Sequence, residues 1–204
     1  MRWKSLKHTS ISDWPMPKLA GFKFYLWHIF HIFINIIYIY FMKGFSSSSS
    51  QVFSQKPDQL WNVISSENNL NYTHPFCKTN EIIIWTDNDR RDKLVYLNGL
   101  TFIREFSEWF EGIGYNLWIG TKRGPRSYVE WRIKEHTLGS ELTITVYPYL
   151  LRKWPRLISF LPYYLYINPK LTSYLNSVVG GFKWYLDKGT AVPRNHFGKH
   201  PWFS

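Results

Sequence analysis

Residues 169–187 read Pro-Lys-Leu-Thr-Ser-Tyr-Leu-Asn-Ser-Val-Val-Gly-Gly-Phe-Lys-Trp-Tyr-Leu-Asp, and this stretch decides the fold class. Its apolar residues recur three and four positions apart, which is the spacing of one face of an α-helix. Pro169 at the start and Gly189 just past the end are typical of helix boundaries. The stretch therefore predicts a long amphipathic helix whose apolar face another element must cover. That face comprises Leu171, Tyr174, Leu175, Val178, Val179, Phe182, Tyr185 and Leu186.

The chain before this helix alternates between apolar and polar residues in short runs, a pattern that predicts β-strands. Val129, Trp131 and Ile133 alternate with charged residues, and Asn98-Gly99 is a strong hairpin signal. We expect half-buried antiparallel strands with one apolar and one wet face. The predicted strands are residues 81–85, 93–98, 101–110, 115–119, 126–134 and 141–147.

Three further segments precede these strands. Residues 57–64 carry a proline at their start and apolar residues at helical spacing, so they predict a short amphipathic helix. The serines of residues 46–50 are typical of a flexible linker, and equally of the start of an edge strand because Gln51-Val52-Phe53 follows them. Residues 68–75 are polar and predict a turn.

This order of elements, together with the residues of 56–65 and 69–76, resembles the START-like SRPBCC (Bet v 1-like) superfamily, which includes the polyketide cyclase/dehydrase and lipid transport group. The resemblance covers residues 45–188. It implies an α+β helix-grip fold, in which a curved seven-stranded antiparallel sheet wraps around the long C-terminal helix and encloses an apolar cavity. The superfamily shares no single catalytic set, so no catalytic residue is carried over.

A cavity of this kind would hold a hydrophobic ligand, such as a lipid or a polycyclic molecule. We expect its walls to come from the inward-facing side chains of the strands and the long helix. The predicted lining is Trp85, Tyr96, Phe102, Phe106, Leu117, Val129, Trp131, Ile144, Tyr174 and Val178.

Few polar residues suggest chemistry. His74 is a candidate acid or base, although a structural histidine in a loop before Pro75 is the more common case. Arg104 and Glu108 are predicted to share the strand face of Phe102. They would be either polar anchors in the cavity or exposed cross-strand partners, and exposure is favoured because charges are seldom buried.

The basic residues are concentrated at the two ends of the chain. Residues 150–204 carry a net charge of +7, whereas residues 45–149 are nearly neutral. No nucleic-acid-binding motif accompanies these charges, and their aromatic neighbours suit a membrane surface better. In the insertion at residues 147–167 the candidate membrane contacts are Arg152, Lys153, Trp154 and Arg156. The insertion is either a membrane-docking lid or a helix that caps the core.

Residues 1–23 form a basic segment, and residues 24–43 are apolar enough for a membrane anchor. Met42 is an alternative start, in which case the preceding residues are an upstream translation artefact. The first reading predicts a membrane-associated protein with a single N-terminal anchor, and the second a cytoplasmic one. Residues 189–204 form an aromatic and basic tail, which we expect to lie on the domain because exposed aromatic rings are costly.

The sequence shows no cofactor motif and no metal site, and its single cysteine, Cys77, excludes an intramolecular disulfide. The main hypothesis is therefore a hydrophobic-ligand-binding protein. The first alternative is a cyclase or dehydratase that uses His74 or a tyrosine as acid or base. The second is an interaction module with a filled core. The absence of motifs lowers the expectation of an enzyme without excluding one.

Overall fold

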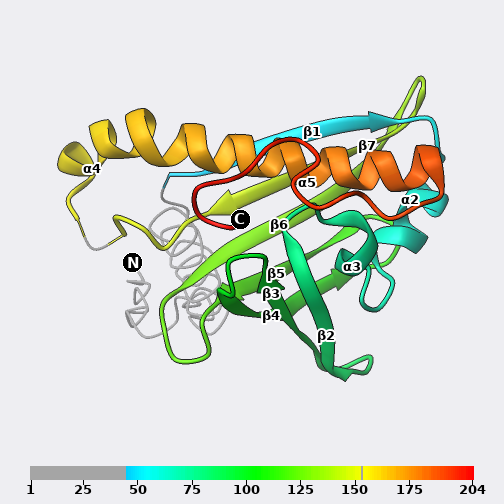
Figure 1. Cartoon of the computed structure of the whole chain (residues 1–204), viewed down its shortest axis with the longest axis horizontal. Coiled ribbons are helices and arrows are strands. Elements are labelled where there is room, and N and C mark those ends of the chain that lie inside the picture. Colours follow the sequence, from blue (N-terminus) through cyan, green and yellow to red (C-terminus); the bar gives the residue numbers. More distant parts are fainter. Residues whose placement is uncertain (1–44, 153) are drawn as a thin grey trace, which may run out of the picture. The chain divides into compact units, whose positions relative to one another are not determined.

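The computed structural model describes residues 45–152 and 154–204, so the candidate anchor at 24–43 lies outside the described residues. The described residues belong to one compact unit. Seven strands form one antiparallel sheet in the order β1-β7-β6-β5-β4-β3-β2 (Figure 1). The strands are β1 (Ser47–Phe53), β2 (Cys77–Trp85), β3 (Arg90–Tyr96), β4 (Thr101–Phe110), β5 (Gly114–Gly120), β6 (Arg126–His136) and β7 (Gly139–Tyr147). The helices are α2 (Pro57–Ile64), α3 (Leu70–Thr73), α4 (Arg156–Pro162), the π-helix η2 (Tyr163–Ile167) and α5 (Asn168–Lys188).

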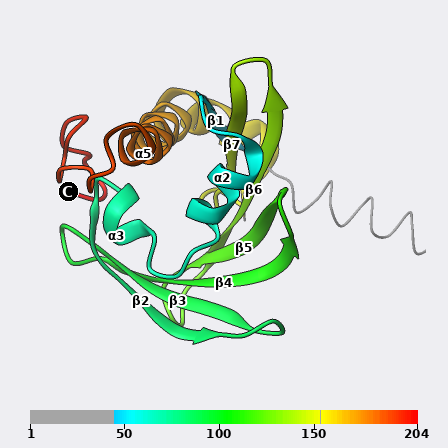
Figure 2. The ribbon, with the colours of Figure 1, turned by 90° about the vertical axis from the view of Figure 1, so that its right-hand side faces the viewer.

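The long helix α5 lies along the concave side of the curved sheet, and α2 and α3 stand at one end of the space between them (Figure 2). The buried face of α5 includes Leu175, Val178 and Phe182. Burying each such side chain contributes about 1.5–3 kcal/mol. Gly189 ends the helix in the left-handed conformation that glycine adopts without strain. The predicted helix-grip fold is therefore confirmed.

The serine run is strand β1, at the edge of the sheet beside α5. Ser47 and Ser49 face the helix and are 1% and 7% exposed. Ser47 Oγ donates to Asn168 Oδ1 over 2.7 Å, and Ser49 Oγ donates to Asn176 Oδ1 over 2.6 Å. Small side chains allow close approach of the helix, and their hydroxyls satisfy polar groups on it. The edge-strand interpretation of residues 46–50 is therefore the correct one.

A β-bulge in β4 changes which residues face the core. The pairing with β5 shifts between Phe106 and Glu108, so the alternation moves by one residue. Trp109 then stacks on the core residue Tyr115 with ring centroids 5.4 Å apart, while Glu108 is exposed. The prediction that Glu108 shares the face of Phe102 was wrong, because a period-two pattern does not reveal a bulge.

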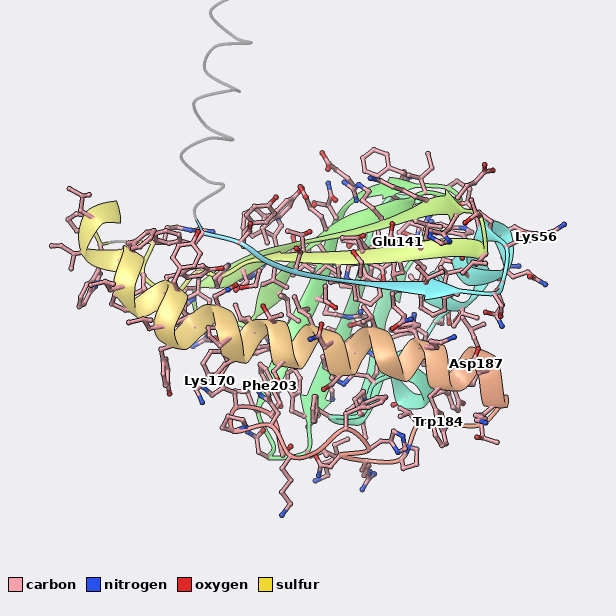
Figure 3. All side chains as sticks on the ribbon, turned by 90° about the horizontal axis from the view of Figure 1, so that it is seen from above. Lys56, Glu141, Lys170, Trp184, Asp187 and Phe203 are labelled. Atoms are coloured by element: carbon pink, nitrogen blue, oxygen red, sulfur yellow. The ribbon has the colours of Figure 1, made fainter. Side chains whose placement is uncertain are left out.

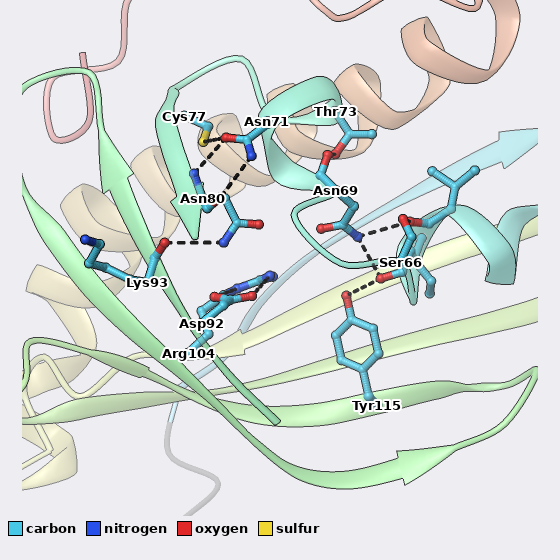
Figure 4. A network of polar contacts seen from close by, with 12 residues as sticks. Ser66, Asn69, Asn71, Thr73, Cys77, Asn80, Asp92, Lys93, Arg104 and Tyr115 are labelled. Carbon is cyan, nitrogen blue, oxygen red and sulfur yellow. Dashed lines mark hydrogen bonds and ion pairs between the residues drawn. The ribbon is translucent and has the colours of Figure 1, made fainter. Parts of the chain in front are cut away.

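The segment 68–75, predicted to be a turn, contains the short helix α3. Asn69 holds it against α2, since its Nδ2 donates to the carbonyl of Ile64 over 2.7 Å (Figure 4). Asn71 holds it against β2, since its Oδ1 accepts from the backbone N–H of Asn80 over 2.7 Å. α3 also packs closely on α5, because a Cβ on Gly181 would lie 2.1 Å from the carbonyl oxygen of Thr73. These side-chain contacts outweigh the turn propensity of the segment.

Candidate ligand-binding site

A cavity of about 90 Å³ lies between the sheet and α5. Eight of the ten residues predicted to line a cavity line this one. They come from β3, β4, β5, β6, β7 and α5, which converge on its walls. These residues are Tyr96, Phe102, Leu117, Val129, Trp131, Ile144, Tyr174 and Val178.

The other two predicted residues, Trp85 and Phe106, lie in a neighbouring aromatic cluster. Their rings pack at 5.2 Å in a T-shaped arrangement, and both contact Trp109. Trp61 of α2 joins the same cluster through Trp109, at 5.2 Å. Side chains fill this end of the fold, so the cavity occupies only part of the space between sheet and helix.

One wall of the cavity carries a chain of hydrogen bonds. His74 Nδ1 accepts from the backbone N–H of Phe76 over 3.2 Å, so the ring proton lies on Nε2. His74 Nε2 then donates to Tyr174 Oη over 2.9 Å. Tyr174 Oη is in turn 3.1 Å from Tyr96 Oη. The chain fixes three polar groups at the edge of an otherwise apolar space.

Burial sets the protonation of this wall. Burial lowers the pKa of His74 to about 3, and the positive charge of Arg104 lowers it as well. Burial also raises the pKa of Tyr96 well above its usual value, and raises that of Tyr174. All three side chains are therefore neutral at physiological pH.

Arg104 also lines the cavity, which corrects the expectation that it is exposed. Its guanidinium and the carboxylate of Asp92 are 4% and 0% exposed, and they form a two-bond ion pair across β3 and β4 (Figure 4). Nε donates to Asp92 Oδ1 over 2.8 Å, and Nη2 donates to Oδ2. Burial opposes the charge on Arg104, but Asp92 outweighs this effect and raises its pKa. The pair therefore stays ionised within the core.

Phe203 is the cavity-lining residue that sequence reasoning missed entirely. Its place in an aromatic tail gave no periodic signal that would assign it to a wall. Other lining residues were not predicted, because the sequence pattern indicates which face of an element a side chain is on but not how close that side chain lies to the cavity. These are Leu70, Leu94, Ile119, Ser127 and Val146, whereas Leu171 and Leu175 lie on the helix face that was expected to line the cavity.

A second hollow, of about 520 Å³, runs along the outer side of α5. It is an open groove, and its lining is mainly polar: Asn168, Pro169, Thr172, Ser173, Asn176, Ser177 and Phe197. Such a groove excludes little water, so the enclosed cavity is the better candidate for a hydrophobic ligand.

The insertion forms α4 and η2, and it is exposed on one side. Tyr163 and Ile167 pack on Leu171, and Phe45 contacts this group. The opposite side presents large apolar residues to solvent, with Leu157 93% and Leu165 75% exposed. We call this side the α4–η2 surface; it consists of Trp154, Leu157, Ile158, Phe160, Leu161, Tyr164, Leu165 and Tyr166. One face of the insertion caps the core, as the second expectation states, and the other face is exposed to solvent.

Of the candidate membrane contacts, Trp154 is 56% exposed and Arg152 is exposed. Lys153 and the side chain of Arg156 lie outside the described part of the chain. Across residues 45–152 and 154–204, none of the helices has the length and hydropathy of a membrane span.

The described residues contain no group of three or more side chains placed to hold a metal ion. Cys77 is buried with a free thiol, and burial raises its pKa to about 12. Its Sγ lies 3.8 Å from Asn71 Oδ1. It therefore behaves as a small buried residue rather than as a reactive thiol.

Several solved structures share this architecture at low sequence identity. A protein of unknown function from Staphylococcus aureus, SA2116, matches 71% of this chain and 94% of its own at 10% identity, with a TM-score of 0.57. MLL2253 from Mesorhizobium loti matches 71% of this chain and 98% of its own at 11% identity, with a TM-score of 0.52.

DynU16, a protein of the dynemicin biosynthetic locus, matches 72% of this chain and 48% of its own at 13% identity, with a TM-score of 0.52. No protein-family model and no curated protein sequence matches the chain. Identities this low show the fold alone. The curved seven-stranded antiparallel sheet, the long α5 in its grip and these structural matches show that the chain has the helix-grip fold, the architecture that its resemblance to the START-like SRPBCC (Bet v 1-like) superfamily implies.

Proposed function

We propose that this protein binds a hydrophobic small molecule, a lipid or a polycyclic compound, between its sheet and α5. One observation carries the proposal: the grip of the sheet on α5 leaves a partly enclosed space whose wall combines apolar residues with the polar side chains of His74, Tyr96 and Tyr174. Apolar pockets with a few oriented polar groups are the usual form of small-molecule sites.

The hydrogen bonds at the polar wall support binding more than acid–base catalysis. Both ring nitrogens of His74 are engaged, so neither offers a lone pair to a substrate proton. The raised pKa values of Tyr96 and Tyr174 make them poor acids near pH 7. Neutral, oriented hydroxyl groups are suited to holding a ligand in one orientation.

Native mass spectrometry of the purified full chain tests the proposal directly. We expect an added mass that is lost on denaturation and that extracts into organic solvent. A chain that carries no such mass, and whose melting temperature does not respond to fatty acids or aromatic alcohols, would favour the interaction module with a filled core.

Val178→Phe should abolish the ligand-bound species while lowering the free energy of unfolding by less than about 1 kcal/mol, because the new ring enters existing space. Val179→Phe is the matched control, since Val179 is 2% exposed and packs beside the cavity rather than on its wall. Overpacking there should cost about 1–3 kcal/mol and leave the ligand in place. Urea unfolding and native mass spectrometry measure the two effects. Equal ligand retention in both variants would contradict binding in this cavity.

We further propose that the protein acts at an anionic membrane, on which the α4–η2 surface docks. Its eight large exposed residues lie within residues 154–166, seven of them on two consecutive helices and Trp154 just before them. No acidic residue occurs between Glu141 and Asp187, whereas Arg152 and Lys170 flank the surface. An exposed apolar surface with flanking cations and no acidic residue nearby in the sequence matches the interface of a bilayer with anionic lipids.

Leu157→Glu combined with Leu165→Glu should weaken binding to phosphatidylcholine vesicles containing phosphatidylserine by at least tenfold, because two apolar side chains leave the membrane and two negative charges approach it. Both leucines are more than two-thirds exposed, so folding is unaffected. Vesicle co-sedimentation measures the change. Leu138→Glu is the control, since Leu138 is 71% exposed at the β6–β7 hairpin, away from this surface.

Residues 24–43 are identical in all these variants, so the comparison isolates the α4–η2 surface. Equal vesicle binding by the double variant and the wild type would overturn the membrane proposal. Loss of a dimer, without any change in vesicle binding, would instead identify the surface as a contact between two copies of the chain.

A further inference from the structure

The segment 190–204 lies beside the cavity and contributes Phe203 to its wall. α5 lies beside β1, at one edge of the sheet, and the tail crosses from the end of α5 toward the opposite edge at β2 and β3 (Figure 2). The backbone N–H of Val192 donates to the Tyr72 carbonyl, and that of Asn195 donates to the Pro75 carbonyl, each over 2.9 Å. Asn98 Nδ2, in the turn between β3 and β4, donates to the Trp202 carbonyl over 2.9 Å.

Phe203 enters an aromatic slot at the end of this segment, beside α5 (Figure 3). Its ring stacks on Tyr96 at 4.4 Å and on His200 at 5.2 Å, with interplanar angles of 26° and 15°. Tyr174 approaches to 4.5 Å. Phe203 is 7% exposed and lines the cavity, so its buried ring forms part of the cavity wall.

His200 holds Phe203 in place. Its Nδ1 accepts from the backbone N–H of Trp202 over 3.3 Å, and its Nε2 donates to the Lys170 carbonyl over 3.0 Å. The bond to Lys170 joins the tail to α5, and the bond from Trp202 fixes the turn of the tail just before Phe203. Most of the preceding residues are exposed, including Phe197 at 46%. The contacts that bury the tail are therefore concentrated at its anchor points and around Phe203.

The size of the cavity requires one wall to move. Pockets for drug-sized ligands measure about 300–1,000 Å³, several times the 90 Å³ enclosed here. The sheet strands that line the cavity are paired on both sides, and α5 is a continuous helix of 21 residues. The tail is held by single hydrogen bonds and three buried side chains, Val192, His200 and Phe203, and elements with few buried contacts open most readily.

We propose that Phe203 is an internal plug that occupies the place of the ligand, and that the natural ligand is a flat aromatic molecule that displaces it. The inference rests on the proposed function, because it needs a ligand in the cavity. The slot is shaped by the faces of Tyr96 and His200, so an incoming ring would recover the stacking that Phe203 gives up. The ligand would then continue into the apolar space beneath it, along Val178 and Leu117.

Binding of 2-naphthol to the full chain, followed by isothermal titration calorimetry, tests the plug. Phe203→Ala should bind 2-naphthol at least tenfold more tightly than the wild type, because the site no longer competes with its own side chain. Phe197→Ala, in the same segment but outside the cavity lining, should bind like the wild type. Decahydro-2-naphthol, which has the same skeleton without aromatic rings, should bind Phe203→Ala several-fold more weakly than 2-naphthol.

Asn98→Asp is a second variant that loosens the tail without removing Phe203, and it keeps the test valid if Phe203→Ala does not fold. The substitution keeps the side-chain oxygen that accepts from Leu100 and removes the donor to Trp202. Asn98 is exposed, so the core is untouched, and the affinity should rise in the same direction by a smaller factor.

Each contrary result has a separate meaning. Equal affinity of the wild type and Phe203→Ala for 2-naphthol, lost from both when Val178→Phe is added, would overturn the plug and leave the cavity as the ligand site. Equal affinity of Phe203→Ala for the two probes would overturn the aromatic class of the ligand. Failure of every variant to bind either probe, with no co-purified molecule in the wild type, would overturn the proposed function itself.

Discussion

Replacing Arg104 by methionine is expected to lower the free energy of unfolding by about 3–5 kcal/mol. The substitution keeps most of the side-chain stem but removes the guanidinium that holds the Asp92 carboxylate, whose side chain is 0% exposed. A buried carboxylate without its partner is costly because it has lost both water and its counter-charge. Urea unfolding followed by circular dichroism measures the change.

Two comparisons separate this loss from a general effect of removing an arginine. Arg126→Met breaks a pair with Glu105 that is 34% and 44% exposed, so it should cost no more than about 1 kcal/mol. Asp92→Leu combined with Arg104→Met replaces both charges and should recover most of the stability. A cost below about 1 kcal/mol for Arg104→Met alone would show that water reaches Asp92 in the folded protein.

Acid should destabilise the protein through His74 by up to about 4–5 kcal/mol, at about 1.4 kcal/mol for each unit of pKa shift. The pKa of His74 is 6.5 in the unfolded chain and about 3 in the folded one. Between these values the unfolded chain binds a proton that the folded chain does not. The stabilisation from neutral His74 is therefore complete above about pH 6.5 and is lost as the pH falls toward 3.

His74→Gln provides the measurement, because a glutamine amide still donates to Tyr174 but does not titrate. The free energy of unfolding of this variant, measured in urea from pH 7 to pH 4, should fall less steeply than that of the wild type. The same substitution at His136, the partly exposed last residue of β6, is the control for replacing a histidine outside the core. Equal slopes for the wild type and His74→Gln would show that His74 is protonated within the fold.

The sequence by itself determined the elements of the fold. The apolar spacing of residues 169–187 predicted α5, because one face of a helix must be buried. Alternation with a period of two predicted the strands from residue 81 to residue 147, because successive side chains of a strand face opposite ways. The same alternation identified six residues on the wall of the cavity, among them Tyr96, Val129 and Ile144, and the helical spacing identified Tyr174 and Val178.

Local patterns were insufficient where the partner of a residue is distant. The serines of β1 resemble a linker until α5 and β7 lie beside them. The exclusion of Trp85 from the cavity depends on a cluster with Trp109, and Trp109 faces inward only because a bulge shifts β4. A bulge depends on the pairing of two strands, so neither strand reveals it alone.

Two features of the cavity wall, the buried ion pair and Phe203, were decided by tertiary structure alone. Asp92 and Arg104 are charged residues that sequence reasoning places on a surface, yet antiparallel pairing of β3 with β4 brings them together in the core. Phe203 reaches the cavity because the tail turns back after α5. Its ring then packs on Tyr96 of β3 and Tyr174 of α5. Periodicity reports which way a side chain points within its own element. It carries no information about which remote segment arrives to cover it, because that choice depends on the packing of the whole domain.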